Sequence, residues 1–539
     1  MNSVHGDLAV GIDVGGTNTD AVVLDPSGAV LAWTKSPTTR DVTGGIRSSL
    51  AAVLDELGPA RAAVSRVMLG TTHATNAIVR RRDLGRVAVV RLGAPAATEY
   101  PPLTGWPADL RDTILAGAVH AGGGHLVDGY PIAELDRDAV RRLLDRLAGR
   151  FDAVAVCGIF SPSFPEQELE VQALVQDHAG LDVPVSLSSE IGALGLLERE
   201  NATVLNAALY RVARDITTAL TTAVVEQGLE AATFFAQNDG TFMAVEYAAR
   251  YPVLTIGSGP ANSIRGAASL SGAGNAIVID VGGTTSDLGV LVERFPREST
   301  MPREIGGVRT NFRMPDILSL GIGGGTMVDM AAGVPLGDSV GYRIAEEALL
   351  FGGSTPTLTD AAATRSAVVT GRTLPALGRS ERAGLAGALT VAHQRIESAV
   401  ERMSLGRTGL PLVVVGGGGF LVPDRVLGAS EVIRPERGNV ANAVGAAIAL
   451  AGGRADRLCE FPDRTAAIEE ASRAAAEKAI QAGADPARVT IVDVLETPVS
   501  YATRPTLKVS VKAAGPLAPT GRVPAAAPKS PSHEGSSMR

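Results

Sequence analysis

The chain has 539 residues, 45% of them hydrophobic and 20% charged, the composition of an ordinary globular protein of about two to four domains. A formal net charge of −8 argues against a nonspecific binder of nucleic acid or of an anionic membrane. Two cysteines, Cys157 and Cys459, form neither a disulfide framework nor a zinc knuckle, and no stretch approaches the roughly 18 apolar residues of a membrane span, so we expect a cytoplasmic enzyme.

The first hundred residues predict the order strand, strand, strand, helix, strand, helix, strand. Residues 8–25 predict a hairpin, and a Pro-Ser-Gly turn leads into a third strand at 29–38. Apolar residues at helical spacing predict a helix over 44–57. The segment 64–82 predicts a strand, a polar loop and a helix, and 85–95 predicts a buried strand. This order is typical of an α/β layer fold.

Later segments predict further strands, turns and glycine loops. Residues 232–243 predict two strands joined by an Asn-Asp-Gly turn, so Asp239 is interpreted as a turn residue. Glu190 in SSEIG is a weak candidate for substrate contact or for a helix N-terminus. Buried strands that end in glycine loops are predicted around GIGGGT, 321–326, and GGGG, 416–419.

One string occurs twice. GIDVGGTNTDAVVLD at residues 11–25 recurs as VIDVGGTTSDLGVLV at 278–292, an offset of 267 residues. The positions that recur unchanged in the second copy are Ile12, Asp13, Val14, Gly15, Gly16, Thr17, Asp20, Val23 and Leu24. A repeat of this density indicates that one structural unit is used in both halves of the chain.

Each copy places Asp-x-Gly-Gly-Thr between two strands. Backbone N–H groups in such a turn form a concave anion site, and threonine hydroxyls can donate to phosphate oxygens. Asp13 and Asp280 stand at strand ends, where carboxylates can hold Mg²⁺ directly or through water, and we predict both as catalytic residues and metal ligands. The predicted nucleotide contacts of the two hairpins are Gly15, Gly16, Thr17, Asn18, Thr19, Gly282, Gly283, Thr284 and Thr285.

The pattern excludes two common nucleotide motifs and resembles a third. No Walker A string occurs, and the glycines of the hairpins lack the spacing of a dinucleotide fingerprint. Twin hairpins resemble the actin, sugar-kinase and Hsp70 ATPase superfamily. The resemblance implies an α/β fold with two duplicated actin/sugar-kinase-like domains around a cleft that binds ATP, and a glycine loop that holds adenosine. The further cofactor-binding residues expected from the glycine loops are Gly323, Gly324, Gly416, Gly417 and Gly418.

The expected domain organisation follows from the two copies. We assign an ATPase domain I that begins with the first hairpin, an inserted middle region, an ATPase domain II with the second hairpin, a small C-terminal appendage and a disordered tail rich in Pro, Ala and Ser. The corresponding residue ranges are 1–92, 93–273, 274–455, 456–514 and 515–539.

Longer strings are more specific than the hairpins. In chain order these are GTTHATNAIV, SSEIG, ERENATVLNAAL, QNDGTFM, SGPANSIRGA, IDVGGTTSDLGVL and DILSLGIGGGTMVD. Together they resemble the hydantoinase A / oxoprolinase family over about residues 8–450. The chain departs from the family's pattern at Asn18, where an aromatic residue is usual, and in its C-terminal part.

The resemblance implies an ATP-dependent, Mg²⁺-requiring subunit that activates a cyclic amide, such as a hydantoin, 5-oxoproline or another lactam, by phosphorylation. No hydantoinase B-like region is present, so the hydrolytic half is expected in a partner chain. Thr72, His73 and Asn76, just beyond a predicted strand end, are candidates for the substrate's carbonyl pocket; the alternative is a helix cap and a surface imidazole.

Several alternatives remain open from the sequence. A carboxylase subunit of the acetone or acetophenone type would phosphorylate a ketone enol or bicarbonate. A stand-alone small-molecule kinase and a nucleotide-binding regulator without chemistry fit less well, because the family strings and the two aspartates are present. No nucleic-acid or membrane partner is expected, and a homo-oligomer is left open.

Overall fold

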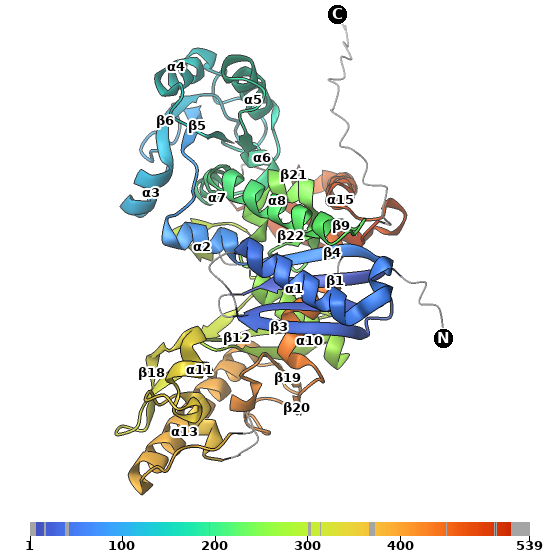
Figure 1. Ribbon diagram of the computed structural model, residues 1–539. Helices are drawn as coiled ribbons and strands as arrows, with labels where there is room; N and C mark the ends of the chain where they lie inside the picture. The colour runs from blue at the N-terminus through green and yellow to red at the C-terminus, as the bar shows by residue number, and fades with distance from the viewer. Residues whose placement is uncertain are drawn as a thin grey trace, which may run out of the picture.

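The computed structural model of the chain describes residues 7–15, 18–37, 42–192, 194–299, 303–312, 314–365, 372–448, 450–500, 502 and 504–518. Three sheets carry most of the fold, with helices around them (Figure 1). The expected α/β architecture is confirmed.

The largest sheet has nine strands and is built from both ends of the chain. In spatial order they are β22 (Thr490–Pro498), β23 (Thr506–Pro516), β21 (Leu450–Glu460), β10 (Phe242–Ala244), β9 (Ala232–Ala236), β4 (Val64–Thr71), β1 (Leu8–Val14), β2 (Asn18–Leu24) and β3 (Val30–Pro37). Helices α1 (Val42–Leu57) and α8 (Tyr210–Glu226) pack against each other beside this sheet, and their apolar side chains join the core of β1, β2 and β4.

A second sheet repeats the plan of the first. Its strands are β13 (Phe295–Pro296), β12 (Ser286–Val292), β11 (Ala276–Val281), β19 (Leu412–Val415) and β20 (Val432–Ile433), with β16 (Leu318–Leu320) also paired to β12. In each half an antiparallel hairpin is followed, after a helix, by a strand that pairs parallel to the hairpin's first strand: β4 with β1, and β19 with β11. Helix α13 (Arg379–Ser404) precedes β19 and covers this second sheet. The repeat in the sequence is therefore a repeat in the fold.

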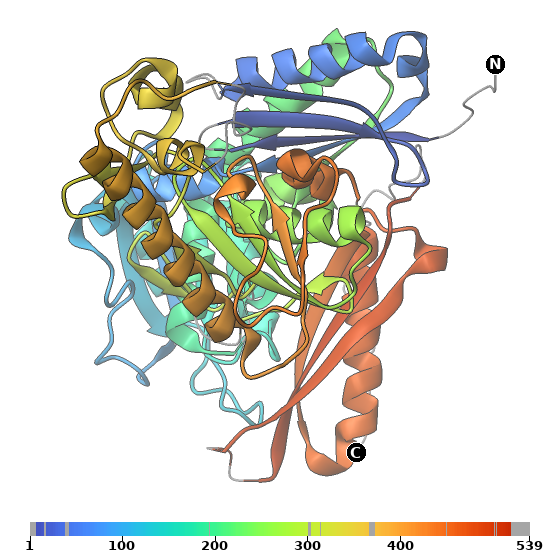
Figure 2. The same ribbon diagram turned by 90° about the horizontal axis from the view of Figure 1, so that it is seen from below.

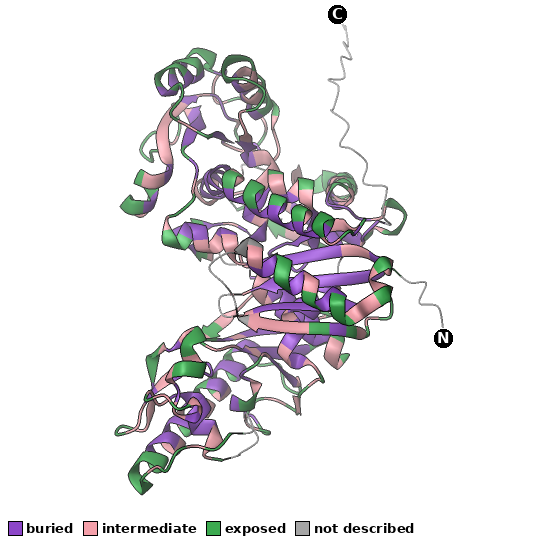
Figure 3. Cartoon of the chain, viewed as in Figure 1, coloured by how far each residue is buried: buried purple, intermediate pink, exposed green. Residues whose placement is uncertain are grey.

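A third, parallel sheet is formed by the middle of the chain. It consists of β6 (Leu115–Gly122), β5 (Val87–Ala94), β7 (Ala153–Gly158) and β8 (Val185–Leu187), and its helices include α3 (Ala108–Ile114), α4 (Arg137–Leu147), α5 (Glu166–Ala179) and α6 (Ser188–Ile191). Helix α7 (Leu196–Ala208) is buried between this sheet and the rest of the chain. In Figure 3 the strands are largely buried, whereas the outer faces of α4 and α13 are exposed.

The C-terminal residues differ in place from the expected appendage. Strands β21, β23 and β22 extend the sheet that contains the first hairpin, and helix α15 (Arg464–Gln481) lies along them (Figure 2). The buried residues of α15 are alanines, whose small side chains allow the helix to pack closely on the strands. The backbones are so close that a Cβ at Gly453 on β21 would overlap the backbone of α15. The first residues of the expected tail are ordered, since Leu517 and Ala518 are buried; residues 519–539 lie outside the described residues.

Two helices join the halves. Helix α10 (Ser258–Ser271) leads into the second sheet, and α14 (Ala441–Ala447) returns from it to pack on β1, β2 and β4. They cross with backbones in contact, because a Cβ at Gly266 would overlap the carbonyl of Ala441 and one at Gly445 would overlap that of Asn262. A Cβ at Gly11 would likewise overlap α14. Glycine at these crossings sets the distance between the halves.

Candidate functional site

The two hairpins close with the same turn. Gly15 donates its backbone N–H to the carbonyl of Asn18 at 3.0 Å, and Gly282 donates to Thr285 at 2.9 Å. Both the donors and the acceptors are related by the offset of the sequence repeat. Thr284 is exposed at the second turn, where its hydroxyl is available to a ligand.

The predicted hairpin residues are only partly described. Gly16 and Thr17 lie outside the described residues. Asn18 is half-buried and Thr19 is buried in β2. In the second copy Gly283 is half-buried and Thr285 is exposed, so the second turn is open to solvent.

The two predicted aspartates lie close to other carboxylates, Asp13 buried and Asp280 half-buried. Asp13 is 5% exposed; burial, together with the negative charges of Asp20 and Asp280, raises the pKa of Asp13 to about 7. Burial also raises the pKa of Asp280 above its ordinary value. The charges of the two hairpins therefore act on one another across the halves, and a bound cation would offset their repulsion.

Two further aspartates belong to the same cluster and were not singled out as site residues in the sequence. Asp20 pairs directly with Asp13 across β1 and β2, and Asp287 pairs directly with Asp280 across β11 and β12. Burial raises the pKa of both Asp20 and Asp287. The signal was present, since Asp20 recurs as Asp287 at the repeat offset.

Helix α10 reaches both hairpins with neighbouring side chains. The Ser263 hydroxyl donates to Asp280 Oδ2 at 2.6 Å and also contacts the side-chain oxygen of Asn442 on α14. Asn262 Nδ2 and Asp13 Oδ1 each lie 2.5 Å from the point that a Cβ of Gly70 would occupy. The string SGPANSIRGA therefore packs the two halves together at the aspartates.

The GIGGGT loop packs against the turn of the second hairpin. Gly324 donates its N–H to the carbonyl of Gly282 at 3.0 Å, and Gly325 donates to Gly283 at 2.7 Å. Gly323 is buried so closely against Thr284 that a Cβ there would meet the backbone of that residue. Gly323 and Gly324, which the sequence predicts as nucleotide contacts, support the hairpin turn, and their amides are bonded to Thr326 Oγ1 and to the Gly282 carbonyl.

The GGGG loop also contacts the second hairpin. Gly418 donates to the carbonyl of Val281 at 2.8 Å, and Gly416 has a φ of +87°, which favours glycine. A Cβ at Gly416 would overlap Asp280 Oδ1. Gly417 is exposed with open space around its Cβ position, so backbone at this point is accessible to a ligand.

The residues beyond β4 divide between two environments. Gly70 and Thr71 pair with Asp13 and Val14, which puts the start of the predicted carbonyl pocket beside the first hairpin. Thr72 donates to the Val14 carbonyl at 3.5 Å and accepts from Asn76 Nδ2 at 3.2 Å.

His73 lies in α2 (His73–Arg80) and lines a small cavity of about 10 Å³ with Val212 and Ile216 of α8. Burial lowers the pKa of this imidazole, which favours its neutral form. The structure therefore does not bring His73 together with the aspartates in any hydrogen bond or ion pair of the described residues.

Several family strings have structural roles. In ERENAT, Glu200 receives two bonds of 2.6 Å from the fully buried Arg91, and Asn201 accepts from Trp106 at 2.6 Å. Glu190 of SSEIG is bound by Arg250 at 2.6 Å and by the Tyr251 hydroxyl at 3.0 Å. These carboxylates are occupied by protein partners.

Asp239 of QNDG has the turn role expected from the sequence. Its carboxylate accepts from the N–H and the hydroxyl of Thr241 at 2.9 and 2.6 Å. The buried ammonium of Lys512 on β23 lies 2.8 Å from Asp239 and 2.9 Å from Glu298, and this charge holds the pKa of Asp239 below its usual range. The cluster fastens the C-terminal strands to both halves of the chain.

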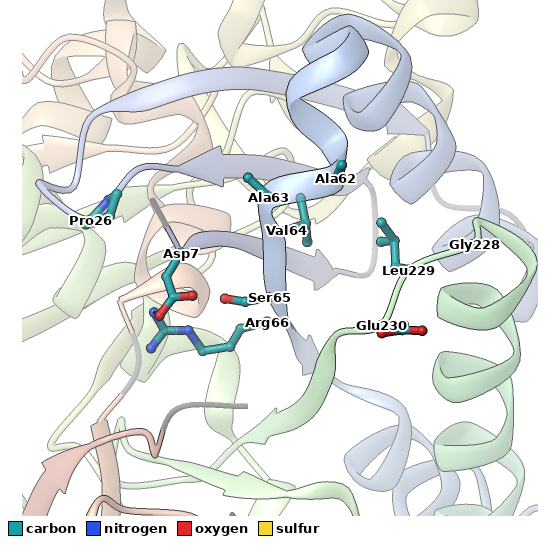
Figure 4. A pocket seen from close by; sticks show the side chains of 10 residues that line it. All are labelled: Asp7, Pro26, Ala62, Ala63, Val64, Ser65, Arg66, Gly228, Leu229 and Glu230. Atoms are coloured by element: carbon teal, nitrogen blue, oxygen red, sulfur yellow. The ribbon is translucent and has the colours of Figure 1, made fainter. Parts of the chain in front are cut away.

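A wide hollow lies away from the hairpins. It has a volume of about 940 Å³ and opens at the amino ends of β1 and β4, where Asp7 and Arg66 point toward each other across it (Figure 4). Asp13 and Thr71 stand at the opposite ends of these strands. This hollow is therefore not the candidate nucleotide site.

The donor set at the hairpins fits Mg²⁺ bound together with a phosphate. No group of three or more His, Cys, Asp or Glu suited to a metal ion occurs among the described residues. Mg²⁺ needs no such cage, because it keeps several waters and is usually held by one or two carboxylates plus substrate phosphates. In the parts of the chain that are described, no helix is long and apolar enough to cross a membrane.

The comparisons with known proteins identify the family. Residues 9–179 match the hydantoinase/oxoprolinase N-terminal region, and residues 199–375 match hydantoinase/oxoprolinase. The chain belongs to the hydantoinase/oxoprolinase family. The resemblance seen in the sequence strings is thereby confirmed.

Two curated relatives of this family member are enzyme subunits. The caprolactamase subunit alpha of Pseudomonas jessenii is 28% identical over 384 residues, which are 65% of this chain and 53% of the relative. The acetophenone carboxylase gamma subunit of Aromatoleum aromaticum is 27% identical over 398 residues, 66% of this chain and 52% of the relative. The chain thus matches about half the length of each.

A solved relative has the same fold. The crystal structure of the ATP-dependent caprolactamase from Pseudomonas jessenii superimposes with a TM-score of 0.73 at 21% identity, over 94% of this chain and 87% of that chain. At this identity the likeness supports the fold alone.

Proposed function

We propose that this chain is an ATP-dependent subunit that activates a cyclic amide by phosphorylation, and that a hydantoinase B-like second chain completes ring opening. The observation that carries the proposal is the meeting of two aspartate-bearing hairpins at α10. Asp13 and Asp280 come from different halves, yet neighbouring residues of one helix contact or adjoin both. Such an arrangement suits one polyphosphate gripped from two sides.

The chemistry asked of this site is positioning and charge neutralisation. Phosphoryl transfer needs little covalent help from protein, and donors aimed at the phosphate oxygens supply most of the rate. Turn amides and the exposed hydroxyls of Thr284 and Thr285 would donate to the phosphates. Asp13 and Asp280 would hold Mg²⁺, which when bound neutralises the charge between the hairpins.

The substrate class that we propose first is a lactam. An unactivated amide resists water because attack must break its resonance. When the amide oxygen takes the γ-phosphoryl group, ADP leaves and the amide carbon becomes electrophilic; water then adds, the ring C–N bond breaks, and a second water releases phosphate. Support comes from the likeness to a caprolactamase subunit, and the subunit nature of that relative supports a partner chain.

A ketone carboxylase is the second candidate. The acetophenone carboxylase gamma subunit matches a similar share of the chain at nearly the same identity. In that reaction a ketone enol or bicarbonate oxygen would take the phosphoryl group, so the same hairpins would serve. The two candidates differ in the acceptor and not in the nucleotide site.

Phosphate release from Mg-ATP tests the proposal. The purified chain, with and without a co-purified second subunit, is offered hydantoin, 5-oxoproline, caprolactam, ketone plus bicarbonate, and sugars. Stimulation by a cyclic amide supports the proposal, whereas stimulation by ketone plus bicarbonate favours the carboxylase. A sugar-stimulated rate without a partner would indicate a stand-alone kinase. Absence of release with every acceptor, in the presence of the partner, would reject the enzyme proposal.

A further inference from the structure

A cluster of largely buried charges lies where the C-terminal strands meet both halves of the chain. Lys512 on β23 lies 2.8 Å from Asp239 in the turn between β9 and β10, and 2.9 Å from Glu298, which follows β13. Arg454 on β21 contacts Glu298 at 2.7 Å. We call this the junction cluster, and its ion-paired members are Asp239, Glu298, Asp456, Arg454, Lys508 and Lys512. The positive and negative charges of these ion pairs balance.

Arg265 on α10 adds one more cation to this cluster. The residue is 7% exposed. Its Cζ lies 5.1 Å from the centre of the Phe295 ring, and Lys512 Nζ lies 5.9 Å from the centre of the same ring. The charge of Asp239 also acts on Arg265, but among the described residues no carboxylate forms an ion pair with it. Arg265 is therefore a buried cation without a paired anion in that part of the chain.

The guanidinium of Arg265 uses only part of its hydrogen-bonding capacity. Nη2 donates to the carbonyl of Ile448 at 3.1 Å, whereas Nε and Nη1 are buried and have no hydrogen-bond partner in the described part of the chain. Arg265 packs against the turn that holds Asn238 and Gly240, and Asn238 Nδ2 is likewise buried without a partner there. Unpaired buried donors are destabilising, and more so when they are charged, so in native proteins they are bound to a water or an ion.

The charge of the cluster favours an anion over a water. With Arg265 the junction cluster has one positive charge in excess. Burial lowers the pKa of Arg265 to about 10, so the guanidinium still carries its charge at neutral pH. The Phe295 ring attracts this cation but does not neutralise it. Asp493, opposite Lys512 on β22, is exposed and forms no ion pair among the described residues. A water would satisfy the free donors, but an anion would also cancel the excess charge.

We propose that Nε and Nη1 of Arg265 bind one small monovalent anion of the size of chloride, which completes the junction cluster. The excess is a single charge and the guanidinium is almost wholly enclosed, so a compact monovalent anion suits the site better than phosphate or sulfate. The bound anion stabilises the place where α10, the β9–β10 turn of the first half and β13 of the second half meet. The inference goes beyond the proposed activity and does not depend on it.

Thermal unfolding in two sodium salts tests the inference. The full chain is unfolded in sodium chloride and in sodium isethionate at the same ionic strength, since isethionate is too large an anion for an enclosed site. Arg265→Met removes the proposed donors. Arg457→Met is the matched control, because Arg457 lies on the opposite face of β21 and is paired with Glu470 of α15 at 2.9 Å. Both variants lose one arginine, so their net charges are equal.

An anion that binds only the folded chain raises its unfolding temperature, so the wild type should unfold at least about 2 °C higher in chloride than in isethionate. This difference should persist in Arg457→Met and disappear in Arg265→Met. If the wild type unfolds at the same temperature in both salts, or if Arg265→Met keeps the full difference, the buried donors hold water only and the inference is wrong.

Bromide provides a direct test that needs no variant. Crystals of the wild-type chain are soaked in sodium bromide, and bound bromide is located by its anomalous scattering. We expect a bromide within hydrogen-bond distance of Nε and Nη1 of Arg265. Bromide at surface positions alone, or a water at the guanidinium in its place, would overturn the inference even if Arg265→Met did not fold.

Discussion

Replacing Asp13 by asparagine should stabilise the ligand-free chain. A carboxyl whose pKa is raised in the folded state contributes stability below its unfolded pKa, and that stability is lost as the pH rises through the folded pKa. For Asp13 the pKa rises from 3.8 to about 7. At about 1.4 kcal/mol per unit, this difference in pKa between the folded and unfolded states lowers the free energy of unfolding, relative to a side chain that does not titrate, by about 4 kcal/mol at about pH 8 and by about 2 kcal/mol at about pH 5.5.

The assay is denaturant unfolding at these two pH values in EDTA. Trp33 lies on β3 in the same sheet as Asp13, and the other tryptophan, Trp106, is buried in the middle region. A Trp106→Phe background therefore makes the fluorescence report on the sheet of interest. The advantage of Asp13→Asn over its parent should be larger at the higher pH.

Asp25→Asn is the matched control. It removes a carboxylate just after β2, but Asp25 accepts hydrogen bonds from the Ser27 hydroxyl and the Ala29 N–H, which hold its pKa below the ordinary value. This variant should not gain stability. If Asp13→Asn is no more stable than its parent at about pH 8, or if its advantage does not change with pH, the reasoning that Asp13 is held under electrostatic strain is wrong.

Three further changes test the packing. Gly266→Ala should destabilise the chain by about 3 kcal/mol or more in thermal unfolding, because its Cβ would overlap the carbonyl of Ala441, whereas Gly259→Ala on the same helix, with open space around it, should stay within about 1 kcal/mol. Lys512→Ala should lower the unfolding free energy by about 3–5 kcal/mol, because it removes a buried ammonium that leaves Asp239 without its cation and Glu298 with Arg454 alone; a loss below 1 kcal/mol would contradict this. Arg91→Ala should lower it by a similar amount, about 3–5 kcal/mol, because its carboxylate partner is 1% exposed, and an unchanged denaturation midpoint would refute that estimate.

The core of the site was predictable from the sequence. Two hairpins with identical residues at one offset fold into the same pairing and the same turn, because the alternation of apolar residues and the paired glycines are local signals. The positions of Asp13 and Asp280 at the ends of their strands could be predicted from these local signals alone. Asp20 and Asp287 were visible in the same repeat, and antiparallel register is the argument that assigns them to the cluster.

Other features depend on long-range packing. The sequence of β21, β22 and β23 does not indicate which sheet these strands join. In the structure they extend the sheet of the first hairpin. The role of Gly323 depends on which surface of the second hairpin its loop covers. Lys35 on β3 and Ser319 on β16 take the same place beside the two hairpins, as the strand register shows. The sequence repeat does not reveal this, because β13, β14 and β15, all within residues 295–310, come between β12 and β16. His73 follows a strand end as expected, but its helix turns it toward α8.

The measurement that tests the central claim most directly is calorimetric titration of Mg-AMPPNP into the wild type, Asp13→Asn and Asp280→Asn. If one nucleotide is gripped by both hairpins, the wild type binds one equivalent, and each single variant weakens that one site at least tenfold while its circular dichroism stays native. Two equivalents in the wild type, or loss of affinity in only one of the two variants, would contradict a nucleotide held from both sides.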